Sequence, residues 1–151
     1  KRNAMSPELH YEMDDALERL AIDSDTKVLI LTGAGKAFCA GQDLKTYFRG
    51  LSNDPVSRSR AAAASESWRS YRLIGFPKPT IAMVNGFVFG GGLTPIVSCD
   101  VAIASHTATF GISEINWGNL SMLKYIMKKS TKEHLSKRRG IIFHFRLVKI
   151  F

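Results

Sequence analysis

Two glycine-rich segments have the residue types and spacing to hold a reacting carbonyl group. They span residues 33–44 and 85–92, and each follows a short apolar run. Because glycine has no Cβ, turns built from it let backbone N–H groups approach a ligand closely. Two such groups that converge on one point stabilise the oxyanion formed when a thioester carbonyl becomes an enolate. The pattern is consistent with an oxyanion hole, although two ordinary tight turns explain the same residues.

Two nucleotide-binding motifs fail in the first of these segments. A dinucleotide-binding fingerprint requires glycine where Phe38 stands. A P-loop requires glycine at Ile30 and serine or threonine at Ala37. The segment is therefore not expected to bind a nucleotide in either of these ways.

Strands and helices must position the two turns, and the sequence predicts an α/β domain. Buried strands are predicted from the β-branched, apolar runs at 27–32, 80–84 and 100–104, with a further strand at 109–111. Helical spacing begins after Ser6 and again over 57–74. Short helices are expected after Asp43 and after Gly92. Strands that alternate with helices indicate the α/β class.

The positive charge is confined to the end of the chain. Residues 119–151 hold nine Lys and Arg and one acid, Glu133, out of totals of 21 and 13. The other 118 residues therefore carry 12 charges of each sign. We place a boundary at 118, between a domain of residues 1–118 and a basic tail of residues 119–151. The neutral part has no electrostatic footprint for nucleic acid.

Composition predicts a globular protein of the cytoplasm. The chain is 45% hydrophobic and 23% charged, and no apolar run has the length of a membrane span. The first residues are charged and contain no apolar secretory core. Cys39 and Cys99 lack the spacing of metal ligands, so two reduced thiols and no metal site are expected.

Several motifs resemble those of the crotonase (enoyl-CoA hydratase/isomerase) superfamily and occur in that family's order. They are KRNAMSP at 1–7, LTGAG through AGQDLK at 31–45, KPTIAMVNG through GGG at 78–92, CD at 99–100 and FG at 110–111. The string SEINWG at 113–118 is similar to the hydroxycinnamoyl-CoA hydratase-lyases in particular. The resemblance covers residues 1–118 and implies a crotonase-like ββα spiral that is incomplete at both ends.

The resemblance also implies four catalytic positions. The two oxyanion-hole N–H groups fall on Gln42 and Gly91, and the acid/base carboxylate falls on Glu114. A second functional position falls on Thr94, where ordinary two-carboxylate hydratases carry Glu. Thr can orient water by hydrogen bonding, as Ser does in the hydratase-lyases, so Thr94 favours the hydratase-lyase reading.

The resemblance places substrate-binding residues around these positions. Tyr47 matches a tyrosine that contacts the substrate phenol in the hydratase-lyases. Lys1 and Ala4 fall in the segment that binds the coenzyme A moiety, and Ser113 and Trp117 in the acyl pocket. The remaining predicted contacts lie in the two glycine turns: Ala40, Gly41, Asp43, Leu44 and Gly92.

The implied reaction is hydration and retro-aldol cleavage of a 4-hydroxycinnamoyl-CoA such as feruloyl-CoA. Its products are a hydroxybenzaldehyde, here vanillin, and acetyl-CoA. The resemblance implies no cofactor, because coenzyme A is part of the substrate, and it implies a homotrimer or dimer of trimers for a complete fold. The alternatives are another enoyl-CoA hydratase or isomerase, or a truncated, inactive fragment. A basic tail that binds nucleic acid or an anionic membrane is the least favoured interpretation.

Overall fold

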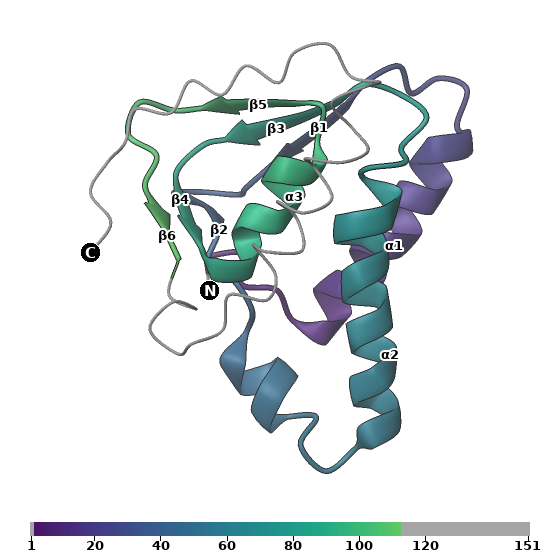
Figure 1. The fold of residues 1–151 in the computed structure, drawn as a ribbon, viewed down its shortest axis with the longest axis vertical. Coiled ribbons are helices and arrows are strands. Elements are labelled where there is room, and N and C mark those ends of the chain that lie inside the picture. The colour runs from purple at the N-terminus through teal and green to yellow at the C-terminus, as the bar shows by residue number, and fades with distance from the viewer. Residues whose placement is uncertain (1, 113–151) are drawn as a thin grey trace, which may run out of the picture.

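Residues 2–112 form two parallel three-stranded sheets covered by helices (Figure 1). The computed structural model describes residues 2–112, so the predicted boundary at 118 and the basic tail lie outside the described residues. The first sheet has the order β1-β3-β5, with bounds Leu29–Thr32, Thr80–Val84 and Val101–Ala104. The second has the order β2-β4-β6, with bounds Ala37–Cys39, Phe87–Phe89 and Phe110–Gly111.

Successive strands alternate between the sheets, and helices return the chain. A tight turn takes each strand of the first sheet to a strand of the second. Between β2 and β3 run the π-helix η1 (Leu44–Arg49), α2 (Pro55–Glu66) and the π-helix η2 (Ser67–Arg72). Between β4 and β5 run the 3₁₀ turn η3 (Gly90–Gly92) and α3 (Leu93–Ser98). This repeat is the ββα spiral, which confirms the predicted fold class.

The first helix begins where the sequence predicts. Helix α1 spans Pro7–Ile22, and the Ser6 hydroxyl accepts a hydrogen bond from the Leu9 N–H at 3.3 Å. A serine cap followed by proline satisfies a free donor and fixes φ for the first turn. Helices α1 and α2 lie side by side (Figure 1).

The strands β2 and β4 are absent from the sequence prediction, which placed both segments in loops. Each has only three residues, and they pair with one another in parallel, Ala37 opposite Phe87 and Cys39 opposite Val88. Such short strands exist through pairing between segments some 50 residues apart, and no local pattern of residues encodes that pairing. The expectation of a loop from Ala37 to Cys39 was therefore wrong.

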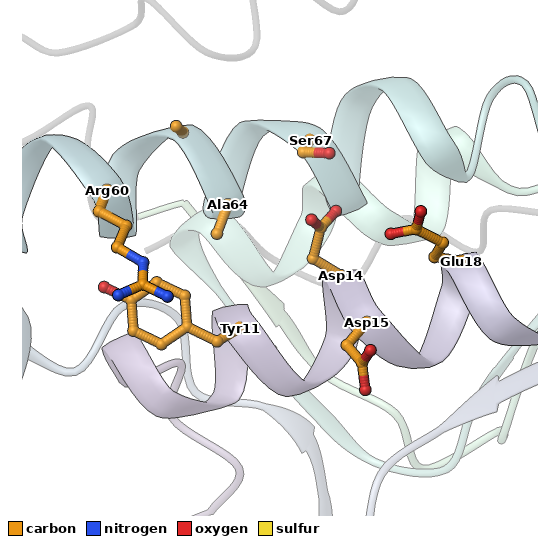
Figure 2. Close-up of a pocket in the computed structure, with 8 residues that line it drawn as sticks. Tyr11, Asp14, Asp15, Glu18, Arg60, Ala64 and Ser67 are labelled. Carbon is orange, nitrogen blue, oxygen red and sulfur yellow. The ribbon is translucent and has the colours of Figure 1, made fainter.

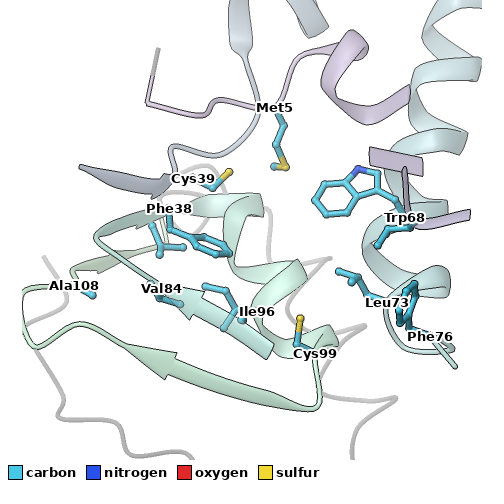
Figure 3. Packing of buried hydrophobic residues seen from close by; sticks show 13 residues of the cluster. Met5, Phe38, Cys39, Trp68, Leu73, Phe76, Val84, Ile96, Cys99 and Ala108 are labelled. Atoms are coloured by element: carbon cyan, nitrogen blue, oxygen red, sulfur yellow. The ribbon is translucent and has the colours of Figure 1, made fainter. Parts of the chain in front are cut away.

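The core lies between the two sheets and the helices (Figure 3). Both cysteines are buried there and form no disulfide. Of the residues on the outer face of the first sheet, Ile30, Met83 and Ile103 are exposed. The buried cluster consists of Met5, Leu17, Phe38, Cys39, Trp68, Leu73, Phe76, Ala82, Val84, Val88, Ile96, Cys99 and Ala108.

Side-chain hydrogen bonds fix the turns that join the two sheets. The Asn85 amide accepts from the Gly33 N–H at 3.1 Å and donates to the carbonyls of Gly33 and Gly35, both at 2.9 Å. One side chain after β3 thus holds the turn after β1. At the other end of the sheet, the Asp100 carboxylate holds the start of β3. It accepts hydrogen bonds from both the backbone N–H and the hydroxyl of Thr80, each at 2.8 Å.

Two kinds of feature are absent from residues 2–112. No helix in this range is long and apolar enough to cross a membrane. No group of three or more His, Cys, Asp or Glu side chains in the same range is arranged to hold a metal ion.

Candidate active site

The two glycine-rich turns lie directly against each other. Gly41 has φ of +86°, and a Cβ added there would lie 2.8 Å from the Phe89 carbonyl oxygen and 3.9 Å from the Gly91 nitrogen. A residue with a side chain is strained at this φ and has no room for its Cβ. Glycine at 41 therefore allows segments some 50 residues apart in the sequence to meet.

The Gln42 backbone N–H is directed away from the strand-like segment that pairs with it. The Met5 N–H donates to the Gly41 carbonyl at 2.8 Å, and the Met5 carbonyl accepts from the Asp43 N–H at 2.9 Å. This is a parallel bridge between Met5 and Gln42, in which the groups of Gln42 itself point to the opposite side. Within residues 2–112, no acceptor takes a hydrogen bond from the Gln42 N–H.

The second predicted donor lies at the start of a helical segment. Gly91 is the middle residue of η3, and the first N–H groups of a helix have no partner within it. A Cβ on the next residue, Gly92, would lie 2.9 Å from the Cβ of Cys39, so η3 packs tightly on β2. The strand β2 and the turn η3 thereby hold Gly91 beside Gly41.

A polar chain lies beneath the first turn and fixes the Gln42 side chain. The Trp68 indole N–H can only donate, so His10 Nδ1 accepts from it at 2.9 Å. The ring proton of neutral His10 is then on Nε2, and the Gln42 atom that lies 2.8 Å from this nitrogen is Nε2. Two donors cannot bond, so the Gln42 amide must be turned over to accept through its oxygen. Burial, reinforced by the Arg69 charge, lowers the pKa of His10 to about 4. The chain Trp68–His10–Gln42 is therefore held in its neutral form at pH 7.

An arginine lies beneath the second turn. Arg69 is only 8% exposed, and its Nη1 donates to the Gly91 carbonyl at 3.4 Å. Its Nε donates to the Ser65 carbonyl at 2.9 Å, and its Nη2 to the Ser65 hydroxyl at 2.5 Å. Burial lowers the pKa of this guanidinium. A cationic side chain is thus in contact with one of the two candidate donor residues.

Two further predicted residues lie in this neighbourhood. The half-buried Tyr47 projects from η1 and contacts His10 edge to face, with ring centroids 5.7 Å apart. Burial raises the pKa of the Tyr47 phenol, so this group is a hydrogen-bond donor at neutral pH. Thr94 lies on α3, less than one turn beyond Gly91, and is 2% exposed.

The other predicted residues have structural partners or lie outside the described part. Asp43 caps η1, because its Oδ1 accepts from the N–H groups of Lys45 and Thr46 at 3.0 and 3.2 Å. Leu44 is 70% exposed, Ala4 is half-buried, and the Ala40 N–H donates to the Arg2 carbonyl at 3.0 Å. Four predicted residues lie outside residues 2–112, and their roles stay predictions: Lys1, Ser113, Glu114 and Trp117.

Sequence reasoning missed His10, Arg69 and the hydrogen bond of Trp68. Trp68 lies within the helix predicted over 57–74, where helical spacing of apolar residues gives it no role beyond packing. His10 and Trp68 are 58 residues apart, so nothing local indicates that they bond. Arg69 in the middle of a helix resembles an ordinary surface cation. The one feature of the sequence that could have indicated this contact is the position of Arg69 directly after Trp68 in the predicted helix.

A separate hollow lies between α1 and α2, away from the glycine turns (Figure 2). It has a volume of about 500 Å³ and an acidic wall that includes Asp14 and Glu18. Arg72 pairs with both of these carboxylates, at 2.6 and 2.9 Å, and Arg60 lies over the Tyr11 ring with its guanidinium carbon 5.1 Å from the centroid. Asp14 and Glu18 are thus neutralised by Arg72, which does not itself line the hollow.

Comparison with known proteins agrees with this geometry. The model of the family described as enoyl-CoA hydratase/isomerase matches residues 1–136. Hydroxycinnamoyl-CoA hydratase-lyase of Pseudomonas fluorescens is 54% identical over 121 residues, which are 78% of this chain and 43% of that protein. (E)-benzylidenesuccinyl-CoA hydratase of Thauera aromatica is 34% identical over 122 residues, 80% of this chain and 46% of that protein.

A solved structure described as a putative enoyl-CoA hydratase/isomerase (crotonase) of Legionella pneumophila superposes with a TM-score of 0.75. The two sequences are 32% identical, and the superposed region covers 91% of this chain and 53% of the Legionella chain. The chain thus spans about half the length of the relatives that it matches.

Proposed function

Because the chain belongs to the enoyl-CoA hydratase/isomerase family, we propose that it hydrates and then cleaves a 4-hydroxycinnamoyl-CoA thioester such as feruloyl-CoA. The observation that carries this proposal is the approach of Gly41 to the Phe89–Gly91 turn, which sets the Gln42 and Gly91 segments side by side. Support for the substrate class comes from the 54% identity to a hydroxycinnamoyl-CoA hydratase-lyase.

In the hydration step, the thioester oxygen lies between the N–H groups of Gln42 and Gly91. Glu114 takes a proton from water as the water oxygen bonds to the β-carbon, and the Thr94 hydroxyl orients this water. The electron pair of the double bond moves toward the thioester, giving an enolate that the two N–H groups stabilise. Protonation of the α-carbon completes the β-hydroxy thioester.

In the cleavage step, Glu114, which has returned its proton to the α-carbon, accepts the proton of the β-hydroxyl group, and the bond between the α- and β-carbons breaks. The electron pair of that bond again forms a thioester enolate, so the same two donors act a second time. Protonation of this enolate gives acetyl-CoA, and the other fragment leaves as a hydroxybenzaldehyde. Tyr47 contacts the phenol of the substrate. Neither step transfers electrons to an acceptor, so the proposal requires no redox cofactor.

The first prediction concerns Glu114. Supplied with feruloyl-CoA, the chain should release vanillin and acetyl-CoA, measured by ultraviolet absorbance and chromatography. Glu114→Gln keeps the size of the side chain but cannot accept the proton, so turnover should fall by about a hundredfold. Equal turnover by Glu114→Gln would exclude its role as the base. Accumulation of the β-hydroxy thioester without aldehyde would show a hydratase that does not cleave.

Size-exclusion chromatography and circular dichroism belong with this assay, because the chain spans 43% of its Pseudomonas relative. The proposed assembly is a homotrimer. A discrete trimer with turnover supports the enzyme. Aggregation or a molten state without turnover supports the alternative, an inactive fragment of the family fold.

A further inference from the structure

Arg69 occupies the space in which a side chain of residue 91 would lie. A Cβ added to Gly91 would be 3.1 Å from Arg69 Nη1, and the same nitrogen donates to the Gly91 carbonyl at 3.4 Å. Such a separation is tighter than most contacts of a Cβ. The guanidinium, 8% exposed, therefore lies against the backbone of Gly91, a candidate oxyanion donor.

The hydrogen-bond acceptors of Arg69 are all neutral, and the one carboxylate within residues 2–112 that acts on its charge, Glu66, is exposed to solvent. Its other two nitrogens end on the carbonyl and the hydroxyl of Ser65. Within residues 2–112, no carboxylate forms an ion pair with Arg69. Arg72, on the same helix η2, instead pairs with Asp14 and Glu18 at the surface.

A buried cation without an ion-pair partner is costly, which calls for a reason to keep it there. Removing a charge from water is strongly unfavourable unless an anion or strong hydrogen bonds compensate it. A neutral donor would be sufficient to tie η2 to the Gly91 carbonyl. The charge becomes useful when an anion forms beside Gly91, and the thioester enolate of the proposed reaction is such an anion.

We propose that Arg69 is a positioning residue of the oxyanion hole, which orients the Gly91 turn and stabilises the bound enolate through its fixed positive charge. This inference rests on the proposed function, because it assigns Arg69 to the same site. It predicts that the neutral form of the ligand binds almost equally well with and without the charge. The anionic form should bind more weakly when the charge is removed.

Acetoacetyl-CoA tests this without turnover, because its enolate absorbs in the near ultraviolet and the keto form does not. The chain is saturated with acetoacetyl-CoA and the enolate absorbance is followed against pH. The wild-type chain should lower the pH at which the bound ligand ionises, relative to free acetoacetyl-CoA. Arg69→Met should raise that pH by about one unit, a tenfold smaller ionisation constant, because a unit charge several Å away has an effect of that order.

Matched variants separate charge from structure. Arg69→Lys keeps the charge and should stay within about 0.3 pH units of the wild type, whereas Arg69→Gln should behave as Arg69→Met does. Arg72→Met removes a half-buried arginine of the same helix, one that pairs with Asp14 and Glu18, and should leave the pH of ligand ionisation unchanged. Replacing a buried charge by an apolar side chain of similar volume is often neutral for stability, and circular dichroism checks the fold. Arg69→Gln serves if the methionine variant does not fold.

The outcomes distinguish this inference from the function on which it rests. If the wild-type chain fails to lower the pH at which bound acetoacetyl-CoA ionises, the oxyanion hole itself is refuted, and the proposed role of Arg69 is refuted with it. If the wild type and both neutral variants lower this pH equally, Arg69 only holds η2 against the Gly91 turn, and the inference alone is overturned. A lysine variant as defective as the methionine variant would also overturn the role of the charge.

Discussion

Acidification from pH 7 to pH 4 should cost the folded chain about 3 kcal/mol of stability through His10 alone. Burial, followed by the Arg69 charge, lowers the pKa of His10 from 6.5 to about 4. The unfolded chain therefore binds a proton at His10 as the pH falls below 6.5, while the folded chain does not until about pH 4. Stability falls across this window by about 1.4 kcal/mol per pH unit and levels off below it.

The structural reason is that protonated His10 loses a partner. His10 Nδ1 accepts from the Trp68 indole, and a proton added to this nitrogen would face another donor. The ring is fully buried, so no water replaces the lost acceptor. Protonation should thus break the hydrogen bond to Trp68 and loosen the packing of α1 against η2, while the Nε2–H of His10 still faces the Gln42 amide.

Urea unfolding at pH 7 and pH 4, for the wild type and two variants, measures this effect. His10→Gln removes the titrating group. Its free energy of unfolding should therefore fall by about 3 kcal/mol less than that of the wild type between pH 7 and pH 4. His106→Gln changes an exposed histidine after β5 and should leave the acid sensitivity in place. If all three chains lose the same stability between the two pH values, His10 does not carry the dependence.

The elements that local chemistry determines could be predicted from the sequence. The serine–proline pair placed the start of α1, and the apolar run at 80–84 gave β3 with its observed bounds. Helix 57–74 was predicted as one element, whereas the structure has α2 to Glu66 and then a π-helical turn. A π-helix replaces the α-helical hydrogen bonds by i→i+5 bonds, and the six residues of η2 are too few to show the changed period in the sequence.

The candidate site likewise contains residues that could be predicted from the sequence and residues that could not. The glycines could be identified because only glycine satisfies a positive φ at a close backbone approach, as at Gly41. The polar side chains beneath them could not, because their partners come from distant parts of the chain. Trp68 and His10 meet only once α1 packs against η2, and Arg69 reaches Gly91 only once α3 lies beside the same helix.

Gly41→Ala should destabilise the fold by about 3 kcal/mol and abolish acyl-CoA binding. An alanine at a φ of +86° costs about 1–2 kcal/mol in the backbone. Its Cβ would lie 2.8 Å from the Phe89 carbonyl oxygen, and overpacking of this kind costs a further 1–3 kcal/mol or so. Because the obstructing atom belongs to the backbone, relief of the overlap must move one turn away from the other.

Gly35→Ala is the matched control for this substitution. Gly35 also has a positive φ, +74°, but a Cβ added there meets nothing within 4 Å. It should therefore cost only the backbone term of about 1–2 kcal/mol and leave acyl-CoA binding intact. Chemical unfolding and titration with acetoacetyl-CoA measure both quantities. The difference between the two variants isolates the contact between the turns, since the strain is common to both. If Gly35→Ala and Gly41→Ala are equally stable and bind equally well, the approach of the two turns does not build the site.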